Sequence, residues 1–161
     1  MKEISINLTI KCYDSYEELS DSDERRLCNS AFESLNHAYA PYSNYKVGAA
    51  VLLDDNHIVE GSNQENAVFP LGLCAERVAI FSSNTLYPKA KIKAIAVVTL
   101  GDVEKGKFPG FPCGSCRQVM IDMEYRHQQN IKVFVLDKNK NLLVVDSVKE
   151  LLPIAFDHSA L

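Results

Sequence analysis

The spacing of three cysteines constrains this chain more than any other feature of its sequence. Cys74 opens the segment Cys74-Ala75-Glu76-Arg77, and the other two cysteines lie much later in Pro112-Cys113-Gly114-Ser115-Cys116-Arg117. Cysteine thiolates are zinc ligands, and three protein ligands leave the fourth tetrahedral position open, as in catalytic zinc sites. If all three bind one Zn²⁺, two segments far apart in the sequence must meet in the fold.

Each cysteine segment is predicted to open a helix. Cys113 and Cys116 are three positions apart, so both lie on one face of a helix, and Pro112 suits its first position because the missing N–H would be unpaired there. The helix dipole at that end favours thiolates. Residues two apart on a regular helix point in different directions, so Glu76 can converge with Cys74 only if the other helix begins at about Cys74.

A zinc ion and a glutamate in one pocket predict hydrolytic chemistry. Zinc lowers the pKa of a bound water from 15.7 to about 7 and so supplies hydroxide. Attack on an amidine-type carbon also needs a group that carries the water proton to the ring nitrogen and the leaving amine, and Glu76 is the candidate. Three thiolates overcompensate the charge of Zn²⁺, so we expect Arg77, Arg117 or both to donate hydrogen bonds to them.

Taken singly, these residues have ordinary explanations. A C-x-x-C pair is often a redox pair or half of a zinc ribbon, and a glutamate in the first turn of a helix is favoured by the dipole. The histidines offer no obvious fourth ligand by spacing: His37, His57, His127 and His158. It is the combination, with each part at a helix start, that favours a catalytic zinc.

Composition excludes several other classes of function. The 161 residues, 47% of them hydrophobic, suit one domain over residues 1–161, in which residues 1–20 are a candidate N-terminal extension. A net charge of −4 disfavours a nucleic-acid partner. The sequence has neither a membrane-span-length apolar run nor a signal peptide, and its five cysteines are an odd number, so we expect a cytoplasmic protein without disulfides. We expect Cys12 and Cys28 to be buried apolar residues.

The hydrophobic pattern predicts a mixed α/β fold. Strands are predicted over residues 4–13, 47–53, 57–61, 92–100, 131–136 and 142–145, and helices from N-caps at 20–23 to about 40, and over 74–83, 113–125 and 148–152. The nearly continuous apolar run 92–100 is typical of a strand buried on both faces, and 101–111 is predicted as a loop. This order indicates a three-layer α/β/α sandwich with a mixed, about five-stranded sheet.

At the cysteine segments the sequence resembles the small homotetrameric zinc-dependent cytidine deaminases, whose superfamily combines cysteine ligands with a non-ligand glutamate. Three further segments carry the resemblance. Tyr42–Ala50 looks like the family's Y-S-x-F-x-V-G-A-A, Asn63–Ala67 like its N-x-E-N-A, and Leu151–Phe156 like its L-L-P-x-x-F. The resemblance covers roughly residues 22–158.

The resemblance implies hydrolytic deamination of cytidine and 2′-deoxycytidine to the uridines, with release of ammonia, by a zinc-bound hydroxide and a glutamate proton shuttle. It implies a cytidine-deaminase-like fold, a homotetramer, and a role in pyrimidine salvage. Carried over residue by residue, it implies Cys74, Cys113 and Cys116 as ligands, Glu76 as the shuttle, Asn63 and Glu65 at the ribose, Tyr45 at the pocket wall, the Ala75 backbone near the pyrimidine, and Phe156 reaching a neighbouring subunit's site.

The chain departs from the family pattern at three places. Tyr45 stands where a phenylalanine is usual, which adds a hydroxyl near the sugar. Phe111 stands where a small hydroxyl residue is common and is expected to tighten the base pocket. Val68-Phe69-Pro70-Leu71 replaces the usual small-aromatic stretch. These departures concern substrate preference and not the reaction.

Four alternatives stay open from the sequence. A deaminase of another cytosine-containing molecule, such as a blasticidin-type antibiotic, keeps the zinc motif but generally alters the N-x-E-N-A segment. A deoxycytidylate deaminase usually has His where Cys74 stands. A non-catalytic zinc-stabilised domain predicts a closed fourth ligand position and no need for Glu76. A nucleic-acid editor is disfavoured by the acidic pI of about 5.6.

Overall fold

A computed structural model describes residues 1–100 and 109–157. Its centre is a six-stranded mixed sheet in the order β1-β6-β5-β4-β2-β3. The elements follow the chain as β1 (Lys11–Tyr13), α1 (Ser22–Ser34), β2 (Val47–Leu53), β3 (Ile58–Ser62), α2 (Ala75–Leu86), β4 (Ile92–Thr99), α3 (Gly114–His127), β5 (Lys132–Leu136), β6 (Leu142–Val145) and α4 (Val148–Leu151). The predicted loop at 101–111 lies largely outside the described residues.

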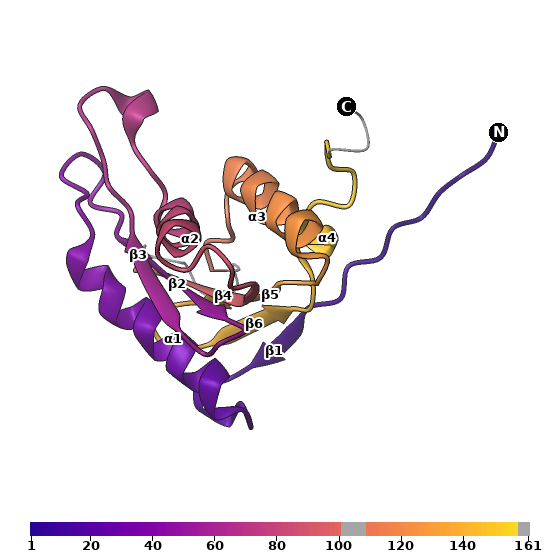
Figure 1. The fold of residues 1–161 in the computed structure, drawn as a ribbon, viewed down its shortest axis with the longest axis horizontal. Coiled ribbons are helices and arrows are strands. Elements are labelled where there is room, and N and C mark those ends of the chain that lie inside the picture. The colour runs from indigo at the N-terminus through magenta and orange to yellow at the C-terminus, as the bar shows by residue number, and fades with distance from the viewer. Residues whose placement is uncertain (101–108, 158–161) are drawn as a thin grey trace.

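Helices cover both faces of the sheet, which makes three layers (Figure 1). On β4, the side chains of Ile95 and Val97 join one buried cluster with α2 and α3, while those of Ala94, Ala96 and Val98 join a second cluster with α1. Alternate residues of a strand point to opposite faces. The expected strand buried on both faces is therefore β4, and the predicted α/β sandwich with a mixed sheet is confirmed, with one strand more than the five expected.

The strand directions place two helix starts at one edge of the sheet. β3 and β4 are both antiparallel to β2, so they run in the same direction. α2 follows β3 and α3 follows β4. Residues 63–74 connect β3 to α2 and residues 100–113 connect β4 to α3, and both helices begin near the edge at which these strands end. This is the topological reason why the two cysteine segments meet.

Two predicted elements are too long. The first helix ends at Ser34 and a 3-10 turn, Leu35–His37, follows it. The chain then turns extended because the backbone of Tyr39 exchanges hydrogen bonds with the segment after β3, donating to the Asn63 carbonyl at 3.0 Å and accepting from Glu65 N at 2.9 Å. The predicted strand 4–13 is paired only over Lys11–Tyr13, where β6 offers partners.

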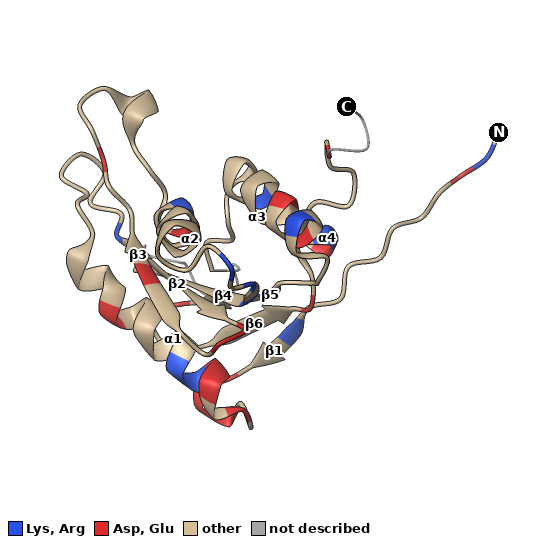
Figure 2. Ribbon diagram, viewed as in Figure 1, with Lys and Arg blue, Asp and Glu red and all other residues tan. Residues whose placement is uncertain are grey.

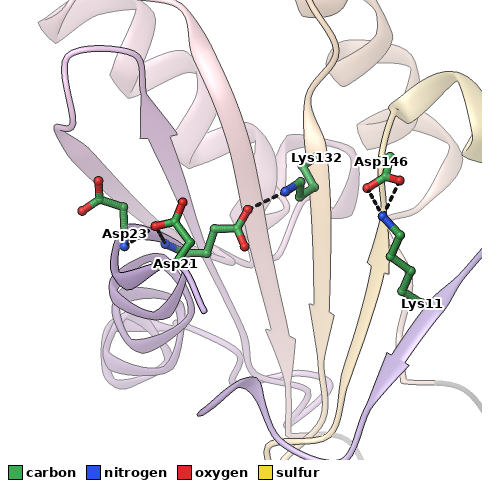
Figure 3. A network of polar contacts seen from close by, with 6 residues as sticks. Lys11, Asp21, Asp23, Lys132 and Asp146 are labelled. Atoms are coloured by element: carbon green, nitrogen blue, oxygen red, sulfur yellow. Dashed lines mark hydrogen bonds and ion pairs between the residues drawn. The ribbon is translucent and has the colours of Figure 1, made fainter. Parts of the chain in front are cut away.

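The N-terminal residues divide into two parts. Residues 1–8 are exposed and extend away from the body (Figure 1). Farther along, Lys11 forms an ion pair with Asp146 at 2.6 Å beside β1 (Figure 3), and the side chains of Tyr16 and Leu19 are buried against α1. Cys28 is buried as expected, but Cys12 is exposed, because β1 is an edge strand.

A second ion pair ties α1 to the sheet. Lys132 of β5 contacts Glu24 of α1 at 2.5 Å, beside the N-cap where Asp21 accepts from Asp23 N (Figure 3). Acidic and basic residues are interspersed along α1, α3 and α4 (Figure 2). Among the described residues, no helix is long and apolar enough to span a membrane.

Candidate active site

Two helix N-termini carry the three cysteines. Cys74 is the N-cap of α2, which begins at Ala75, and Cys113 is the N-cap of α3, which begins at Gly114. The expectation that a helix begins at about Cys74 is therefore confirmed. The proposed reason for the other start is wrong in detail, because Pro112 precedes the N-cap and does not occupy the first helical position. Cys116 lies in the first turn of α3 and is fully buried.

The three sulfur atoms are arranged as zinc requires. They all lie within 4.8 Å of one another. The Sγ of Cys113 lies 3.9 Å from that of Cys74 and 3.5 Å from that of Cys116. A Zn–S distance of about 2.3 Å in a tetrahedron places two sulfurs about 3.8 Å apart. The side chains as they stand therefore fit three corners of a zinc tetrahedron.

The cluster favours one thiolate, that of Cys74, before any metal is considered. A hydrogen bond from the Cys116 thiol lowers the pKa of Cys74 to about 5, with help from Arg77 and Cys113. The pKa of Cys116 changes in the opposite direction: it is raised because the Cys116 thiol donates to Cys74 and is buried. One negative charge is thus already stabilised among the three sulfurs, and a divalent cation stabilises the others.

The two arginines beside the ligands make different contacts. Arg77 donates from Nη2 to the Cys74 sulfur at 3.5 Å, while its Nε is buried without a hydrogen-bond partner among the described residues. Arg117 donates to two backbone carbonyls, that of Pro112 at 2.7 Å and that of Leu151 at 3.1 Å. Its described hydrogen bonds thus link the start of α3 to the end of α4, and Arg77 is the one that touches a sulfur.

Glu76 lies beside the sulfur cluster in a dry environment. Its side chain is 4% exposed, and burial raises the pKa of its carboxyl, to which the Cys74 charge adds. A hydrogen bond from Cys116 and the charge of Arg77 act in the opposite sense. A carboxyl with a raised pKa in a pocket is suited to take up and release protons near neutral pH.

A cavity of about 640 Å³ opens from this cluster, a volume typical of small-molecule sites. Its walls come from the loop before β2, the segment between β3 and α2, the end of β4 and the start of α3. Residues lining it include the following predicted site residues: Tyr45, Asn63, Glu65, Cys74, Glu76 and Cys113. Phe111 also lines it, as expected for a residue beside the base pocket.

Asn63 and Glu65 brace one wall of the cavity. Asn63 accepts from Val47 N and donates to the Tyr45 carbonyl, both at 2.9 Å. Glu65 accepts from Tyr42 N at 2.8 Å and from the Ser43 hydroxyl, and these hydrogen bonds lower the pKa of its carboxyl. Both side chains therefore fix the loop that carries Tyr45 and still face the cavity.

Two predicted contacts lie off the cavity wall of this chain. Ala75 is fully buried in the first turn of α2. Phe156 is 64% exposed, and its carbonyl accepts a 2.7 Å hydrogen bond from Gln118 of α3. Sequence reasoning missed Ser43, Thr99 and Gly110, which also line the cavity. Only the two-residue alternation along β4, which places Thr99 on the face of Val97, offered a signal.

The chain is similar in sequence to known zinc-binding deaminases, in agreement with the three-sulfur cluster. Residues 21–130 match the family described as "Cytidine and deoxycytidylate deaminase zinc-binding region". The chain is 35% identical over 134 residues, 83% of this chain and 94% of the other, to the cytidine deaminase of Halalkalibacterium halodurans. The chain belongs to the cytidine and deoxycytidylate deaminase family.

Solved structures of cytidine deaminases share the fold. The enzyme from Burkholderia pseudomallei superposes with a TM-score of 0.70 at 39% identity, over 82% of this chain and 98% of that one. The enzyme from Mycobacterium tuberculosis superposes with a TM-score of 0.64 at 31% identity, over 85% and 99%. The segment that matches the family's zinc-binding region, residues 21–130, contains all three clustered cysteines.

Proposed function

We propose that this protein catalyses the hydrolytic deamination of cytidine and 2′-deoxycytidine to uridine and 2′-deoxyuridine, with release of ammonia. One observation carries the proposal: a three-sulfur cluster with zinc geometry and the buried Glu76 lie together at a cavity large enough for a nucleoside. The family membership and the named relatives support the same reaction.

Cys74, Cys113 and Cys116 would hold the zinc ion. When bound, zinc supplies Lewis acidity that lowers the pKa of water to about 7. Arg77 balances the excess charge of three thiolates by donating to Cys74. Arg117 supports the site indirectly, because its hydrogen bonds to the carbonyls of Pro112 and Leu151 fix the backbone that carries Cys113.

Glu76 handles the protons of the reaction. Its carboxylate accepts a proton from the attacking water, whose oxygen bonds to C4, and donates it to N3 of the pyrimidine. It then carries the proton of the new C4 hydroxyl to N4, so that the C4–N4 bond breaks, ammonia leaves and the C4 carbonyl forms. Burial is the first cause that raises the pKa of the Glu76 carboxyl, and a raised pKa favours the protonated form that must return the proton. The buried setting also keeps bulk water from competing for these protons.

The remaining contacts orient the nucleoside. Asn63 and Glu65 line the cavity, and their hydrogen bonds to the Tyr45 loop leave further acceptor lone pairs and one amide proton of Asn63 unused. These remaining groups can accept from and donate to ribose hydroxyls. Tyr45 and Phe111 supply aromatic walls for the base. We assign the backbone N–H of Ala75, the first residue of α2, to a pyrimidine oxygen, because N–H groups in the first turn of a helix have no intrahelical partner.

Assembly and location are parts of the same proposal. Phe156 is exposed and lies off the cavity of its own chain, which suits a side chain that reaches the site of a neighbour in a homotetramer. All five cysteines belong to the described residues and are free thiols, as a reducing cytoplasm maintains them. A pyrimidine-salvage role follows from the reaction.

The rival functions lack comparable support. A purely structural zinc does not explain why a buried carboxylate shares the cavity with the ligands. A nucleic-acid editor needs a basic, aromatic-lined channel, whereas acidic and basic residues are interspersed along the helices of this chain, whose net charge is −4 (Figure 2). The intact Asn63–Ala67 segment argues against a deaminase of a cytosine-containing antibiotic.

The test measures the loss of cytidine absorbance by the zinc-loaded protein and by Glu76→Gln. Wild type should turn over cytidine and 2′-deoxycytidine, and Glu76→Gln should lose about a hundredfold or more of kcat while binding zinc as before. An inactive zinc-loaded wild type defeats the proposed function. Comparable turnover by the variant leaves the reaction but removes the role of Glu76. Glu33→Gln, an exposed substitution on α1, is the matched control.

A further inference from the structure

Thr99 ends β4 at the wall of the cavity. Side chains alternate between the two faces of a strand, so Thr99 shares the face of Ile95 and Val97, the face covered by α2 and α3. Its backbone pairs with Val47, the residue that follows the loop carrying Tyr45. Val97, Thr99 and Val47 all line the cavity. Thr99 is thus a polar residue in an otherwise apolar stretch of wall.

Among the described residues, the hydroxyl of Thr99 has no hydrogen-bond partner. The side chain is 3% exposed, and its Oγ1 is one of two buried side-chain polar atoms that lack a partner among the described residues. The other is Nε of Arg77, beside the sulfur cluster. An unpaired buried hydroxyl costs stability that a methyl group in its place would not. Such groups call for an explanation, and both exceptions of this kind lie at the candidate active site.

Gly110 lies against both Thr99 and the Tyr45 hydroxyl. A Cβ on Gly110 would lie 2.7 Å from the Tyr45 Oη, 3.1 Å from Cγ2 of Thr99 and 3.4 Å from Oγ1 of Thr99. A side chain at Gly110 would displace the Tyr45 hydroxyl, so glycine leaves it in place. Tyr45 lines the same cavity as Thr99.

We propose that Thr99 is a specificity-determining residue, whose hydroxyl pairs with an oxygen of the bound nucleoside next to the Tyr45 hydroxyl. The inference rests on the proposed cytidine deaminase activity. No hydrogen bond among the described residues fixes the Thr99 rotamer. Rotation about the Cα–Cβ bond exchanges Oγ1 with Cγ2 and presents the hydroxyl to the cavity. The ligand oxygen is a base carbonyl or a sugar hydroxyl, and the two share one hydrogen-bond chemistry.

The decisive variant is Thr99→Val, which keeps the shape and removes the hydroxyl. We expect kcat/KM for cytidine to fall about tenfold, mainly through KM, because a ground-state contact is lost. We also expect an unchanged or higher melting temperature, because the hydroxyl has no partner to lose. Thr99→Ser keeps the hydroxyl and should retain most of kcat/KM. Thr85→Val on α2, whose hydroxyl donates to the Phe81 carbonyl at 3.1 Å, is the control outside the cavity.

Four substrates separate the two sources of the oxygen: cytidine, 2′-deoxycytidine, 2′,3′-dideoxycytidine and 5′-deoxycytidine. A loss that is equal for all four assigns the contact to the base, whereas a loss that vanishes with one missing sugar hydroxyl assigns it to that hydroxyl. Both patterns support the proposal. Thr99→Val activity within twofold of wild type on every substrate overturns it, and so does a lowered melting temperature, which would show that the hydroxyl stabilises the fold. An inactive wild type defeats the proposed reaction instead.

Discussion

At the scale of single residues, the zinc site depends on contacts that reach only a few positions along the chain. Cys113 and Cys116 converge because one turn of α3 separates them, and Glu76 joins Cys74 because α2 begins between them. Such relations follow from helix geometry, so the sequence was enough to propose them. The partner of Arg77 is equally local, since Cys74 lies three positions before it.

Arg77→Ala should weaken zinc binding about ten- to a hundredfold, because the guanidinium donates to the Cys74 thiolate and offsets the excess negative charge. Competition with a chromophoric chelator measures the zinc dissociation constant directly. Arg126→Ala, at the exposed end of α3, is the matched control and should bind zinc as wild type does. Equal affinity in the two variants would show that Arg77 does not support the ligand.

His127 gives the fold a pH dependence of known sign. Its Nδ1 accepts a 3.1 Å hydrogen bond from Ile92 N, which requires the neutral ring. Burial is the main reason that the pKa of His127 lies below 6.5; Arg126 and Lys91 lower it further, and Asp54 opposes them. The unfolded chain therefore binds a proton first as pH falls below about 6.5, and the free energy of unfolding decreases down to the folded pKa.

His127→Asn should remove that part of the pH dependence, because an amide oxygen can accept from Ile92 N without titrating. Urea unfolding at pH 7.5 and pH 5.5 measures it in both proteins. We expect the wild type to lose more stability between these values than the variant. Identical losses would mean that His127 titrates alike in the folded and unfolded chains.

At the scale of elements, close backbone contacts set where the helices lie. A Cβ on Gly61 of β3 would stand 2.4 Å from Ala79 N and 2.5 Å from the Ala75 carbonyl of α2. The absence of a side chain thus lets α2 rest on β3 and places Cys74 at the cluster. Glu124 has a comparable part in α3: its buried carboxylate accepts from Ile131 N at 2.7 Å and Val148 N at 2.9 Å, which ties α3 to β5 and α4.

Gly61→Ala should destabilise the protein by about 2–3 kcal/mol, since backbone atoms must shift to admit the methyl group. Gly114→Ala is the matched substitution: a Cβ there meets nothing within 4 Å, and alanine in the first turn of α3 should be neutral or stabilise by up to about 1 kcal/mol. Urea denaturation compares the two. A Gly61→Ala protein as stable as Gly114→Ala would refute the contact.

At the scale of the whole molecule, the three cysteines make zinc a link between α2 and α3. The ligands come from two helices that are separated in sequence by β4. A metal that binds the folded protein and not the unfolded chain stabilises it by mass action. The metal should therefore contribute to stability as well as to the reaction.

Chelation should lower the melting temperature, and added zinc should restore it. At free zinc about a thousandfold above its dissociation constant, the stabilisation is about 4 kcal/mol. Differential scanning calorimetry with and without a chelator measures the shift. Cys113→Ser should lose this response, while Cys12→Ser, an exposed cysteine on the edge strand, should keep it. A response that is the same in both variants would place the metal elsewhere.

The sequence by itself determined the ligands, Glu76, the order of the elements and the layered α/β fold, because these depend on local periodicity and short spacings. Its errors lie where partners are distant: the first helix stops at Ser34, and Tyr39 instead pairs with the segment after β3. Only the tertiary structure decided that β3 and β4 run in the same direction, which brings two helix starts together. It also placed the Thr99 hydroxyl, which has no hydrogen-bond partner among residues 1–100 and 109–157, against Gly110 at the cavity, since packing between remote segments leaves no pattern along the chain.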